Sequence, residues 1–485
     1  MGLSYLDQAV EKLNCALVNE EHITVYSDYD TDGLTSSLQW KTLFKLLGHE
    51  DYTVVPYTKR THSIDPNLPS VLLQHKSGLC IISDTGCSEP EMLKYLNSIS
   101  PIIVLDHHKG ILQREIISDT LVVVNPAMWN DGVTMSAACV VFEVIMAWVE
   151  KYRLDDLEYF QRMLSFYPFV SIYADGAYGP TDYVYNLYQL AQDAIYPPEF
   201  SFAQEYFNTS KRFVLFSVAP PINAAFRNNR LDLINELFLN HDRLLSYEKS
   251  DLVDELKVLR NDMRKHIDNL EKIVEPIEVG EFNLVDLTGY LNQGISNEII
   301  WNNKGLIANK IAGKYKKACI CIVNTGDRYT LSVRDFYGRD ILSLMQTIYE
   351  VGGHPSAFGG SMSAHDVLYL KKNLERLSTR LPAPKPKPVL NFAELKEDEV
   401  KHIAFLNEFL HPNAAKLIYA SKTGAKLEPT PAKWGPVYNQ YQLKLPSGTI
   451  IYIKQEAFDD EENPRILIQL YKGKRIGGSM VEPLS

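Results

Sequence analysis

Residues 22–33 read HITVYSDYDTDG, an apolar run that passes directly into a turn with three aspartates. The apolar part has the length and β-branched composition of a buried strand, and the turn holds Asp28, Asp30 and Asp32. Three carboxylates this close repel one another, and a hard divalent cation is the simplest compensation. A solvated acidic turn is the structural alternative. An EF-hand calcium loop is excluded, because Gly33 is misplaced and no Glu stands at the twelfth position.

Three further apolar runs end in acidic residues, and we interpret each as a strand: GLCIISDTG at 78–86, PIIVLDHHKG at 101–110 and PFVSIYADGAYG at 168–179. Helical patterns such as that of residues 36–48 lie between the runs, which predicts a parallel α/β sheet. Ligands bind outside the carboxyl ends of strands in such sheets. The four acidic clusters are therefore expected to converge.

The whole chain has the composition of a globular protein. It has 485 residues, 45% of them hydrophobic, and 49 Lys and Arg against 60 Asp and Glu give a net charge of −11. This acidity disfavours bulk coating of nucleic acid but permits a local basic groove. Six scattered cysteines without a CxxC motif argue against a disulfide framework and a cysteine zinc site. With no basic leader and no apolar run of roughly 18 residues, we expect a cytoplasmic protein without a membrane partner.

Changes of pattern along the chain predict an α/β protein with several parts. Residues 1–185 should form a parallel-sheet catalytic domain, and 186–285 a helical region with a long connector helix, since 252–270 keep helical spacing. Residues 286–380 should form a second, smaller α/β domain. The proline-rich segment 381–390 is interpreted as a linker, and 391–485 as a β-rich module.

The adjacent His107 and His108 directly follow Asp106. A lone histidine is more often structural than a ligand, but a pair beside a carboxylate at a strand end suits a metal site. One imidazole can bind metal, the other can meet an anion, and Asp106 can fix a ring tautomer. Carboxylates with imidazole suit two Mn²⁺ or Mg²⁺ ions and phosphoester hydrolysis by an activated water. Such chemistry requires no serine or cysteine nucleophile.

The motifs DYDTDG, SDTG, LDHHK and YADG resemble, in order and spacing, those of the DHH phosphoesterase superfamily. The triple-aspartate first motif is most similar to that of the RecJ single-strand-specific exonucleases, whereas other branches have a His where Tyr26 stands. The resemblance covers roughly residues 20–375 and includes three later segments: VAPPINAAFRNNR (218–230), LSVRD (331–335) and VGGHPSAFGGS (351–361). Pro221, Phe226 and Phe358 depart from the usual residues, and Phe226 in place of glycine questions the local backbone geometry.

The resemblance implies a role for each matching residue. The metal ligands would be the carboxylates and first histidine of the four motifs: Asp28, Asp30, Asp32, Asp84, His107 and Asp175. Asp84 would bridge the ions, His108 would contact the scissile phosphate, and Asp106 would orient the histidines. Substrate phosphates would be bound by residues of the later segments: Asn223, Arg227, Ser332, Arg334, Gly352, Gly353 and His354. For Arg227 and Arg334, ordinary surface salt bridges are the structural alternative.

The function implied by the resemblance is a Mn²⁺- or Mg²⁺-dependent, processive 5′-to-3′ exonuclease on single-stranded DNA, acting in DNA repair and recombination. Single-strand-binding or replication proteins would be its partners, and the diverged motifs would suit a phage or mobile-element version. Two alternatives stay open. One is a phosphodiesterase for short oligoribonucleotides or cyclic dinucleotides, and the other is an inactive RecJ-like scaffold, which the full set of ligand residues opposes.

Two further stretches are candidates for nucleic-acid contact. Lys310, Lys314, Lys316 and Lys317 form a basic stretch, which is either a solvated helix end or a patch that follows the nucleic-acid backbone. In the C-terminal module, tyrosines and lysines recur along the predicted strands. They would form either the base-stacking platform of an oligonucleotide-binding barrel or an ordinary β core.

Overall fold

The computed structural model contains two compact units, residues 1–384 and 385–485. The described part of the first unit is residues 2–58, 63–177, 181–200, 214–291, 297–349 and 351–384; of the second it is little more than the strands. The two units are described separately. No helix in the described ranges is both long and apolar enough to cross a membrane.

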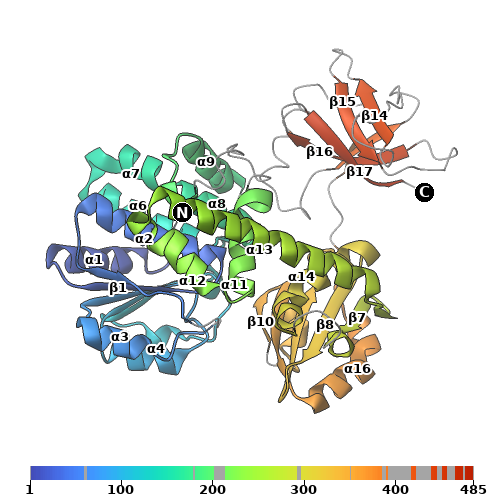
Figure 1. The fold of residues 1–485 in the computed structure, drawn as a ribbon, viewed down its shortest axis with the longest axis horizontal. Coiled ribbons are helices and arrows are strands. Elements are labelled where there is room, and N and C mark those ends of the chain that lie inside the picture. The colour runs from blue at the N-terminus through green and yellow to red at the C-terminus, as the bar shows by residue number, and fades with distance from the viewer. Residues whose placement is uncertain are drawn as a thin grey trace. The chain divides into compact units, whose positions relative to one another are not determined.

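The first sheet, which carries the acidic motifs, is parallel throughout, in the order β2-β1-β3-β4-β5. Its strands are β1 (Ile23–Ser27), β2 (Tyr52–Val54), β3 (Leu79–Ser83), β4 (Ile102–Leu105) and β5 (Leu121–Val124). Figure 1 shows helices on both faces: α3 (Leu68–His75) and α4 (Pro90–Asn97) on one, and α1 (Leu6–Val18), α2 (Thr31–Leu47) and α6 (Ala137–Tyr152) on the other. All strands except the edge strand β2 are therefore buried along their whole length, as expected of a parallel sheet.

The acidic turn after β1 is also the beginning of α2. The carboxylate of Asp30 caps this helix and accepts hydrogen bonds from the backbone N–H groups of Asp32 (2.8 Å) and Gly33 (3.1 Å). The helix therefore begins at Thr31, ahead of the helical pattern in the sequence. A β-carbon on Gly33 would lie only 2.2 Å from the carbonyl oxygen of Asp28, so the turn requires glycine there.

The prediction of a strand within residues 168–179 is wrong, because this run forms the helix α8 (Phe166–Ala174). Every residue from Phe166 to Tyr173 is buried, and α8 packs against both α2 and α6. Burial on all sides removes the periodicity that distinguishes a buried helix from a buried strand. Asp175 therefore follows a helix, whereas the other three acidic clusters follow strands.

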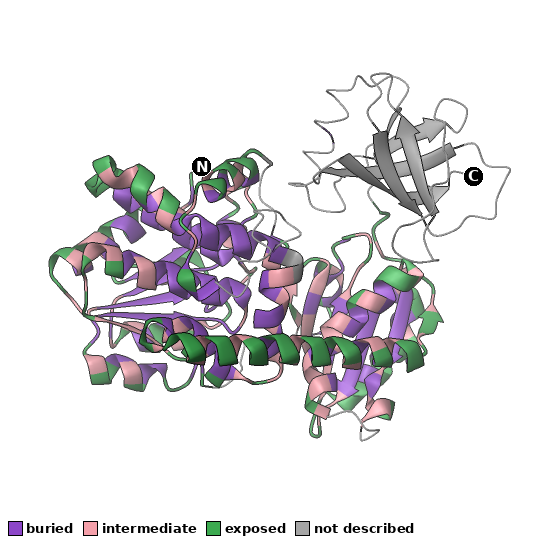
Figure 2. Ribbon diagram, turned by 45° about the horizontal axis from the view of Figure 1, so that its top comes forward, coloured by how far each residue is buried: buried purple, intermediate pink, exposed green. Residues whose placement is uncertain are grey.

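The long helix expected in the middle of the chain is present as α13 (Ser246–Ile273). Figure 2 shows its outer face exposed along its length, while Leu256, Met263, Ile267 and Leu270 are buried. It packs against α11 (Ala219–Arg227) and α14 (Asn297–Tyr315). In the described part of this region and of the first domain there are also shorter helices: α5 (Pro126–Trp129), α7 (Leu157–Leu164), α9 (Thr181–Gln192) and α12 (Leu231–Ile234).

Phe226 does not strain the backbone, although the exonucleases that the sequence resembles usually have glycine at its position. It lies inside α11, is buried, and contacts Tyr57 edge to face with ring centroids 5.1 Å apart. A helical residue has negative φ, so the β-carbon is accommodated.

The second sheet has the order β10-β11-β9-β8-β7-β6 and is antiparallel except between β7 and β8. Its strands are β6 (Ile277–Val279), β7 (Phe282–Asp286), β8 (Ala318–Asn324), β9 (Tyr329–Arg334), β10 (Val351–His354) and β11 (Ala357–Met362). The sheet thus begins ahead of residue 286, because a hairpin turns at Gly280, where φ is +57°. One face packs against α16 (Ala364–Ser378) and the short α15 (Leu342–Met345), and the other against α14.

The described part of the second unit is a six-stranded sheet in the order β12-β13-β16-β17-β15-β14. Its strands are β12 (Val389–Asn391), β13 (Leu417–Ser421), β14 (Asn439–Lys444), β15 (Ile450–Gln455), β16 (Arg465–Lys472) and β17 (Ile476–Pro483). The segments at 441–455 and 465–478 form antiparallel pairs, as their alternating pattern predicts. The tyrosine and lysine side chains proposed for base stacking lie outside the described side chains.

We predict that Gly33→Ala destabilises the protein, whereas Gly313→Ala does not. The added methyl group at Gly33 collides with backbone, and overpacking of this kind costs about 1–3 kcal/mol. A β-carbon on Gly313 in α14 meets nothing within 4 Å, and alanine there should add about 0.5–1 kcal/mol of stability. Urea unfolding of both variants measures the difference. Equal stabilities of the two variants would contradict the close approach seen at Gly33.

Candidate metal centre

Four loops bring the acidic motifs together at the carboxyl edge of the first sheet. Asp28, Asp84 and Asp106 follow β1, β3 and β4, and Asp175 follows α8. In the described part of the chain, three groups of potential ligand atoms contain Asp84, and the atoms of each group lie within 4.8 Å of one another. The first group is Asp28, Asp30 and Asp84, the second is Asp32, Asp84 and His107, and the third is Asp84, Asp106 and His108. The first two groups have only Asp84 in common, so Asp84 stands between two candidate cation sites.

The ring of His107 faces three carboxylates without a hydrogen bond to any of them. Its Nε2 lies 3.3 Å from Asp84 Oδ1, 3.5 Å from Asp32 Oδ2 and 3.7 Å from Asp175 Oδ2. In the described part of the chain, Nε2 of His107, Oδ1 of Asp84 and Oδ2 of Asp175 are buried and have no hydrogen-bond partner. Ligands at about 2.1 Å from a common ion lie about 3 Å apart, so the spacing suits a shared cation.

Asp32 is held by the amino-terminal end of α6. Its two oxygens accept hydrogen bonds from the backbone N–H groups of Ala137 and Ala138, both at 2.8 Å, and from the hydroxyl of Ser171 at 2.5 Å. A helix amino terminus favours a negative charge. Burial and the charge of Asp175 nevertheless raise the pKa of Asp32 to about 7. The site therefore needs a further positive charge for Asp32 to be fully ionised at neutral pH.

The buried position of Asp84 strongly disfavours the negative charge of its carboxylate. It is only 2% exposed, and its backbone lies in the left-handed region with φ of +65°. Burial, followed by the charges of Asp32, Asp30 and Asp28, raises its pKa well above the usual range. A divalent cation would remove this penalty, since it attracts the same carboxylates that repel one another.

Asp106 holds the histidine pair in place, and it also shares a group of potential ligand atoms with Asp84 and His108. Its Oδ1 accepts hydrogen bonds from the backbone N–H of His107 (2.7 Å) and of His108 (3.1 Å), and lies 2.9 Å from His108 Nδ1. Burial opposes ionisation, but His108, His107 and Cys87 together outweigh it and hold the pKa of Asp106 well below its usual range. Burial also disfavours the charge of His108, but Asp106, Asp175 and Asp28 together raise the pKa of that ring to about 10.

The two adjacent histidines consequently differ in charge. Burial and then the neighbouring His108 lower the pKa of His107 to about 3, so the ring is neutral at pH 7 and can serve as a metal ligand. His108 is cationic and partly exposed, which suits contact with an anion.

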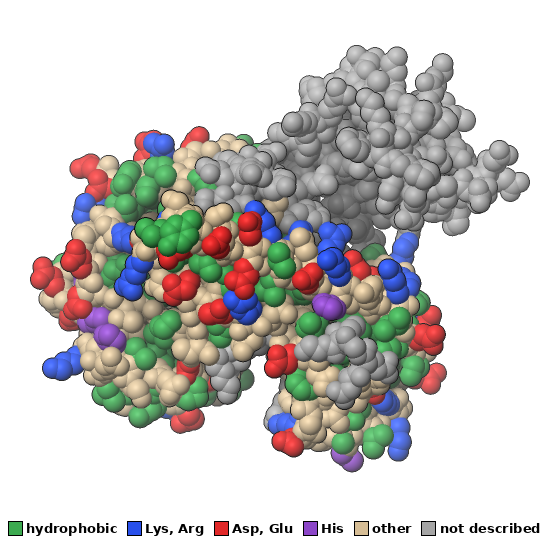
Figure 3. All heavy atoms as spheres, in the orientation of Figure 1, with side chains coloured by type: hydrophobic (Ala, Val, Ile, Leu, Met, Phe, Trp, Pro, Cys, Tyr) green, Lys and Arg blue, Asp and Glu red, His purple; other side chains and the backbone are tan. Residues whose placement is uncertain are grey.

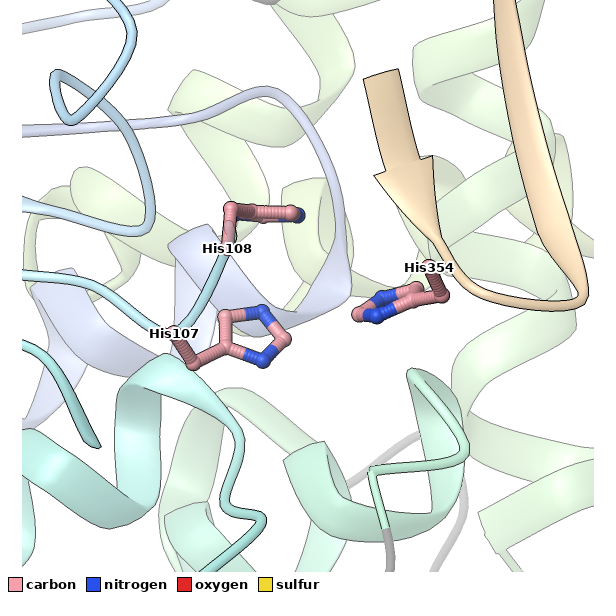
Figure 4. A group of neighbouring side chains, drawn as sticks. All are labelled: His107, His108 and His354. Atoms are coloured by element: carbon pink, nitrogen blue, oxygen red, sulfur yellow. The ribbon is translucent and has the colours of Figure 1, made fainter. Parts of the chain in front are cut away.

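A third histidine reaches the centre from the second sheet. His354, at the end of β10, has its Nε2 3.3 Å from Asp175 Oδ2, and its ring centroid lies 5.3 Å from that of His107 and 5.4 Å from that of His108. Figure 4 shows the three rings turned toward one another from two different domains. The charge of Asp175 is the main cause that raises the pKa of His354. Through the contact with Asp175, His354 of the second sheet reaches the candidate metal centre of the first sheet.

Two of the other expected substrate residues, Arg334 and Asn223, form hydrogen bonds with neighbouring segments. Arg334 is half-buried on β9 and donates from Nη1 to the carbonyl oxygens of Val333 (2.8 Å) and Phe358 (3.4 Å). The side-chain oxygen of Asn223 accepts hydrogen bonds from Thr31, from the backbone N–H and the hydroxyl, and so ties α11 to the start of α2.

The remaining four expected substrate residues lie on the same elements. Ser332 is buried on β9, and Arg227 is half-buried at the end of α11. Gly352 is exposed on β10, and Gly353 beside it has a φ of +132° that favours glycine.

The supporting residues Ser136 and Ser171 were not predicted from the sequence. Ser136 caps α6 and lies 2.6 Å from the Ser171 hydroxyl, which itself donates to Asp32. The Ser-Ala-Ala start of α6 is a recognisable helix signal. Ser171 lies in the run that the pattern presents as a strand, so its approach to the first motif has no signal in the sequence.

The basic stretch at 310–317 is at least partly neutralised by neighbouring acids. Lys310 forms ion pairs with Asp268 (2.9 Å) and Glu271 (2.6 Å) of α13, and Lys317 with Glu278 (2.8 Å). Acidic and basic side chains are interspersed on the face of residues 1–384 that Figure 3 shows. These contacts favour the solvated helix end over a patch for nucleic acid.

Comparison with known proteins finds similarity in sequence and in fold. Residues 22–165 match the DHH family, N-terminal domain. A single-stranded-DNA-specific exonuclease RecJ of Bacillus subtilis (strain 168) is 22% identical over 388 residues, which are 77% of this chain and 48% of that protein. This chain thus spans about half the length of that curated relative.

Solved structures resemble the fold. The crystal structure of RecJ from Thermus thermophilus in complex with Mn²⁺ has a TM-score of 0.71 and 19% identity, over 100% of this chain and 72% of that one. An exonuclease RecJ bound to manganese has a TM-score of 0.57 and 21% identity, over 79% of this chain and 97% of that one. Both share the α/β fold of this chain, and both hold a divalent metal.

We predict that Asp84→Asn stabilises the metal-free protein. An aspartate whose pKa is raised by folding costs stability as the pH rises above about 4, the value in the unfolded chain, whereas asparagine carries no such cost. Asparagine also tolerates the left-handed backbone at this position. In the presence of a chelator, the Tm of the variant should therefore exceed that of wild type, and by more at pH 8 than at pH 5.

Mn²⁺ should reverse this order, because only wild type gains stability by binding it. The exposed Asp327→Asn is the matched control and should follow wild type in both conditions. A metal-free Asp84→Asn protein less stable than wild type at pH 8 would contradict the proposed repulsion at Asp84.

We predict that Ser171→Ala weakens Mn²⁺ binding. Without the hydroxyl the ionised form of Asp32 loses a hydrogen bond, and loss of such supporting groups typically costs about 10–100-fold in metal affinity. Ser165→Ala is the control, because its buried hydroxyl has no hydrogen-bond partner in the described part of the chain. Calorimetric titration at pH 7 compares the two variants, and equal affinities would exclude the supporting role of Ser171.

Proposed function

We propose that this chain, a RecJ-like protein of the DHH family, is a divalent-metal-dependent exonuclease that hydrolyses single-stranded DNA in the 5′-to-3′ direction. The observation that carries the proposal is that Asp84 belongs both to the group with Asp28 and Asp30 and to the group with Asp32 and His107. A site that binds two ions through one bridging carboxylate is typical of enzymes that hydrolyse phosphoesters.

The donor atoms fit two Mn²⁺ or Mg²⁺ ions. Carboxylate oxygens are the ligands that hard cations prefer, and a neutral imidazole is a common partner for Mn²⁺. One ion would be held by Asp28, Asp30 and Asp84, and the other by Asp32, Asp84, His107 and Asp175. Bound there, the ions supply positive charge for the phosphate oxygens and lower the pKa of the attacking water.

The protein's own residues would orient the substrate and complete the charge balance. Asp106 fixes His108 through Nδ1, which leaves the Nε2 of a cationic ring to donate to a phosphate oxygen. His354 and Arg334 bring further positive charge from the second sheet, and Ser332 lies beside Arg334. We assign substrate phosphates to these residues and to Asn223, Arg227, Gly352 and Gly353, whose positions match the family's later motifs.

We propose a separate role for each domain or segment of the chain. Residues 1–185 would hold the ions, 186–285 would connect the two domains, and 286–380 would bind the strand being degraded. The segment 381–390 would link this enzyme core to residues 391–485, for which we propose binding of single-stranded nucleic acid.

The preference for DNA and the direction of hydrolysis rest on similarity to the RecJ proteins, one of which is named a single-stranded-DNA-specific exonuclease. The same metal chemistry would serve a phosphodiesterase of short oligoribonucleotides or cyclic dinucleotides. An inactive scaffold is opposed by the intact ligand set. Action in DNA repair and recombination, and partnership with single-strand-binding proteins, follow only if DNA is the substrate.

We predict that the full chain with Mn²⁺ degrades 5′-labelled single-stranded DNA fastest and releases the labelled mononucleotide first. The experiment compares initial rates on single-stranded DNA, RNA of the same sequence, duplex DNA and linear and cyclic dinucleotides. Asp84→Asn, purified in parallel, controls for contaminating nuclease. Faster hydrolysis of the dinucleotides would favour the small-substrate phosphodiesterase, and no hydrolysis of any substrate would favour the scaffold.

A further inference from the structure

Gly305 in α14 lies opposite Ser332 and Arg334, two polar residues of β9. Ser332 and Arg334 are two positions apart on the strand, so their side chains share one face of the sheet. A β-carbon on Gly305 would lie 2.9 Å from Arg334 Nη2, 3.4 Å from its Cζ and 3.6 Å from the Ser332 hydroxyl. Neighbouring inward positions of α14, such as Ile307 and Ile311, are apolar and buried.

The guanidinium of Arg334 cannot move away from Gly305 without losing contacts. Its Nη1 already donates to the carbonyl oxygens of Val333 and Phe358. Because a guanidinium is planar, fixing Nη1 also fixes the direction of Nη2, which lies against the glycine. Burial lowers the pKa of Arg334, and Cys321, Asp175 and Cys319 offset part of that lowering, so the guanidinium is within electrostatic reach of Asp175.

We propose that Gly305 is a positioning residue: its lack of a side chain leaves the space in which Arg334 and Ser332 are held ready for a substrate phosphate. The inference rests on the proposed function of Arg334 and Ser332. Glycine weakens a helix relative to alanine, and Gly305 lies well inside α14. Helix formation does not explain a glycine at this position, whereas the space that Arg334 needs does.

Gly313 provides a matched control in the same helix, because a β-carbon there meets nothing within 4 Å. The atom nearest to a Gly305 β-carbon is the end of a flexible side chain, so Gly305→Ala should displace the guanidinium without unfolding the protein. Both variants are therefore expected to unfold at or above the Tm of wild type. Only Gly305→Ala should lose contacts with the substrate.

The test uses the full chain with Mn²⁺ and labelled single-stranded DNA. Gly305→Ala should raise KM about tenfold or more, as expected for a lost charged hydrogen bond, with a much smaller change in kcat. The dependence of kcat/KM on salt should weaken, since one phosphate contact is lost. Gly313→Ala should leave KM, kcat and the salt dependence unchanged.

Arg334→Ala completes a double-mutant cycle. If Gly305 acts through Arg334, adding Gly305→Ala to Arg334→Ala should change KM no further. Additive effects in the cycle, or a Gly305→Ala protein with the KM of Gly313→Ala, would overturn the inference.

Failure of the proposed function gives a different pattern. If wild type hydrolyses another phosphodiester instead of single-stranded DNA, the same cycle measured on that substrate still tests Gly305. If wild type hydrolyses nothing, fluorescence anisotropy of labelled single-stranded DNA replaces KM by Kd, and a tenfold weaker Kd of Gly305→Ala alone supports the inference. Arg334→Ala with unchanged KM and Kd would overturn both the phosphate contact and the positioning role.

Discussion

The repulsion among buried carboxylates around Asp84 is the constraint on which the rest of the site depends. Asp84 is buried, belongs to three groups of potential ligand residues and has a strongly raised pKa. A charge of this kind is costly in a protein interior unless an opposite charge accompanies it. Asp32 accepts hydrogen bonds from the amino terminus of α6, and Asp106 is paired with His108. For Asp84, the described cationic neighbour His108 lies 3.8 Å away and has its closer contact, at 2.9 Å, with Asp106, which is why a divalent cation is the economical compensation.

The fold crowds these carboxylates together because it brings segments that are far apart in the chain to one edge of the first sheet. Parallel strands end at the same edge of the sheet, so residues after β1, β3 and β4 meet there. The helices α2, α6 and α8 then bring Asp32, two backbone N–H groups and Asp175 to the same place. His354 arrives from a separate sheet, so substrate would meet positive charge from one domain and proposed metal ligands from the other.

Patterns in the sequence predict the parts of this arrangement whose signals are local. The parallel sheet, the long helix α13 and the hairpins after residue 438 follow from periodicity, length and turns. The helix α8 does not, because complete burial leaves no polar face to reveal its period. Asp28, Asp84 and His107 converge because each comes shortly after a strand of the same parallel sheet, and parallel strands end at one edge. Ser171 and Gly305 act through contacts between segments far apart in the chain, and these have no local signal.

The most direct test of a shared Asp84 is electron paramagnetic resonance of the full chain titrated with Mn²⁺. Two ions bridged by one carboxylate lie about 3.5–4 Å apart and are magnetically coupled. We predict that the spectrum of the loaded protein is that of a coupled pair at two ions per chain, and that Asp84→Asn abolishes the coupling. A spectrum of isolated ions at saturation, or saturation at one ion per chain, would contradict the two-ion centre.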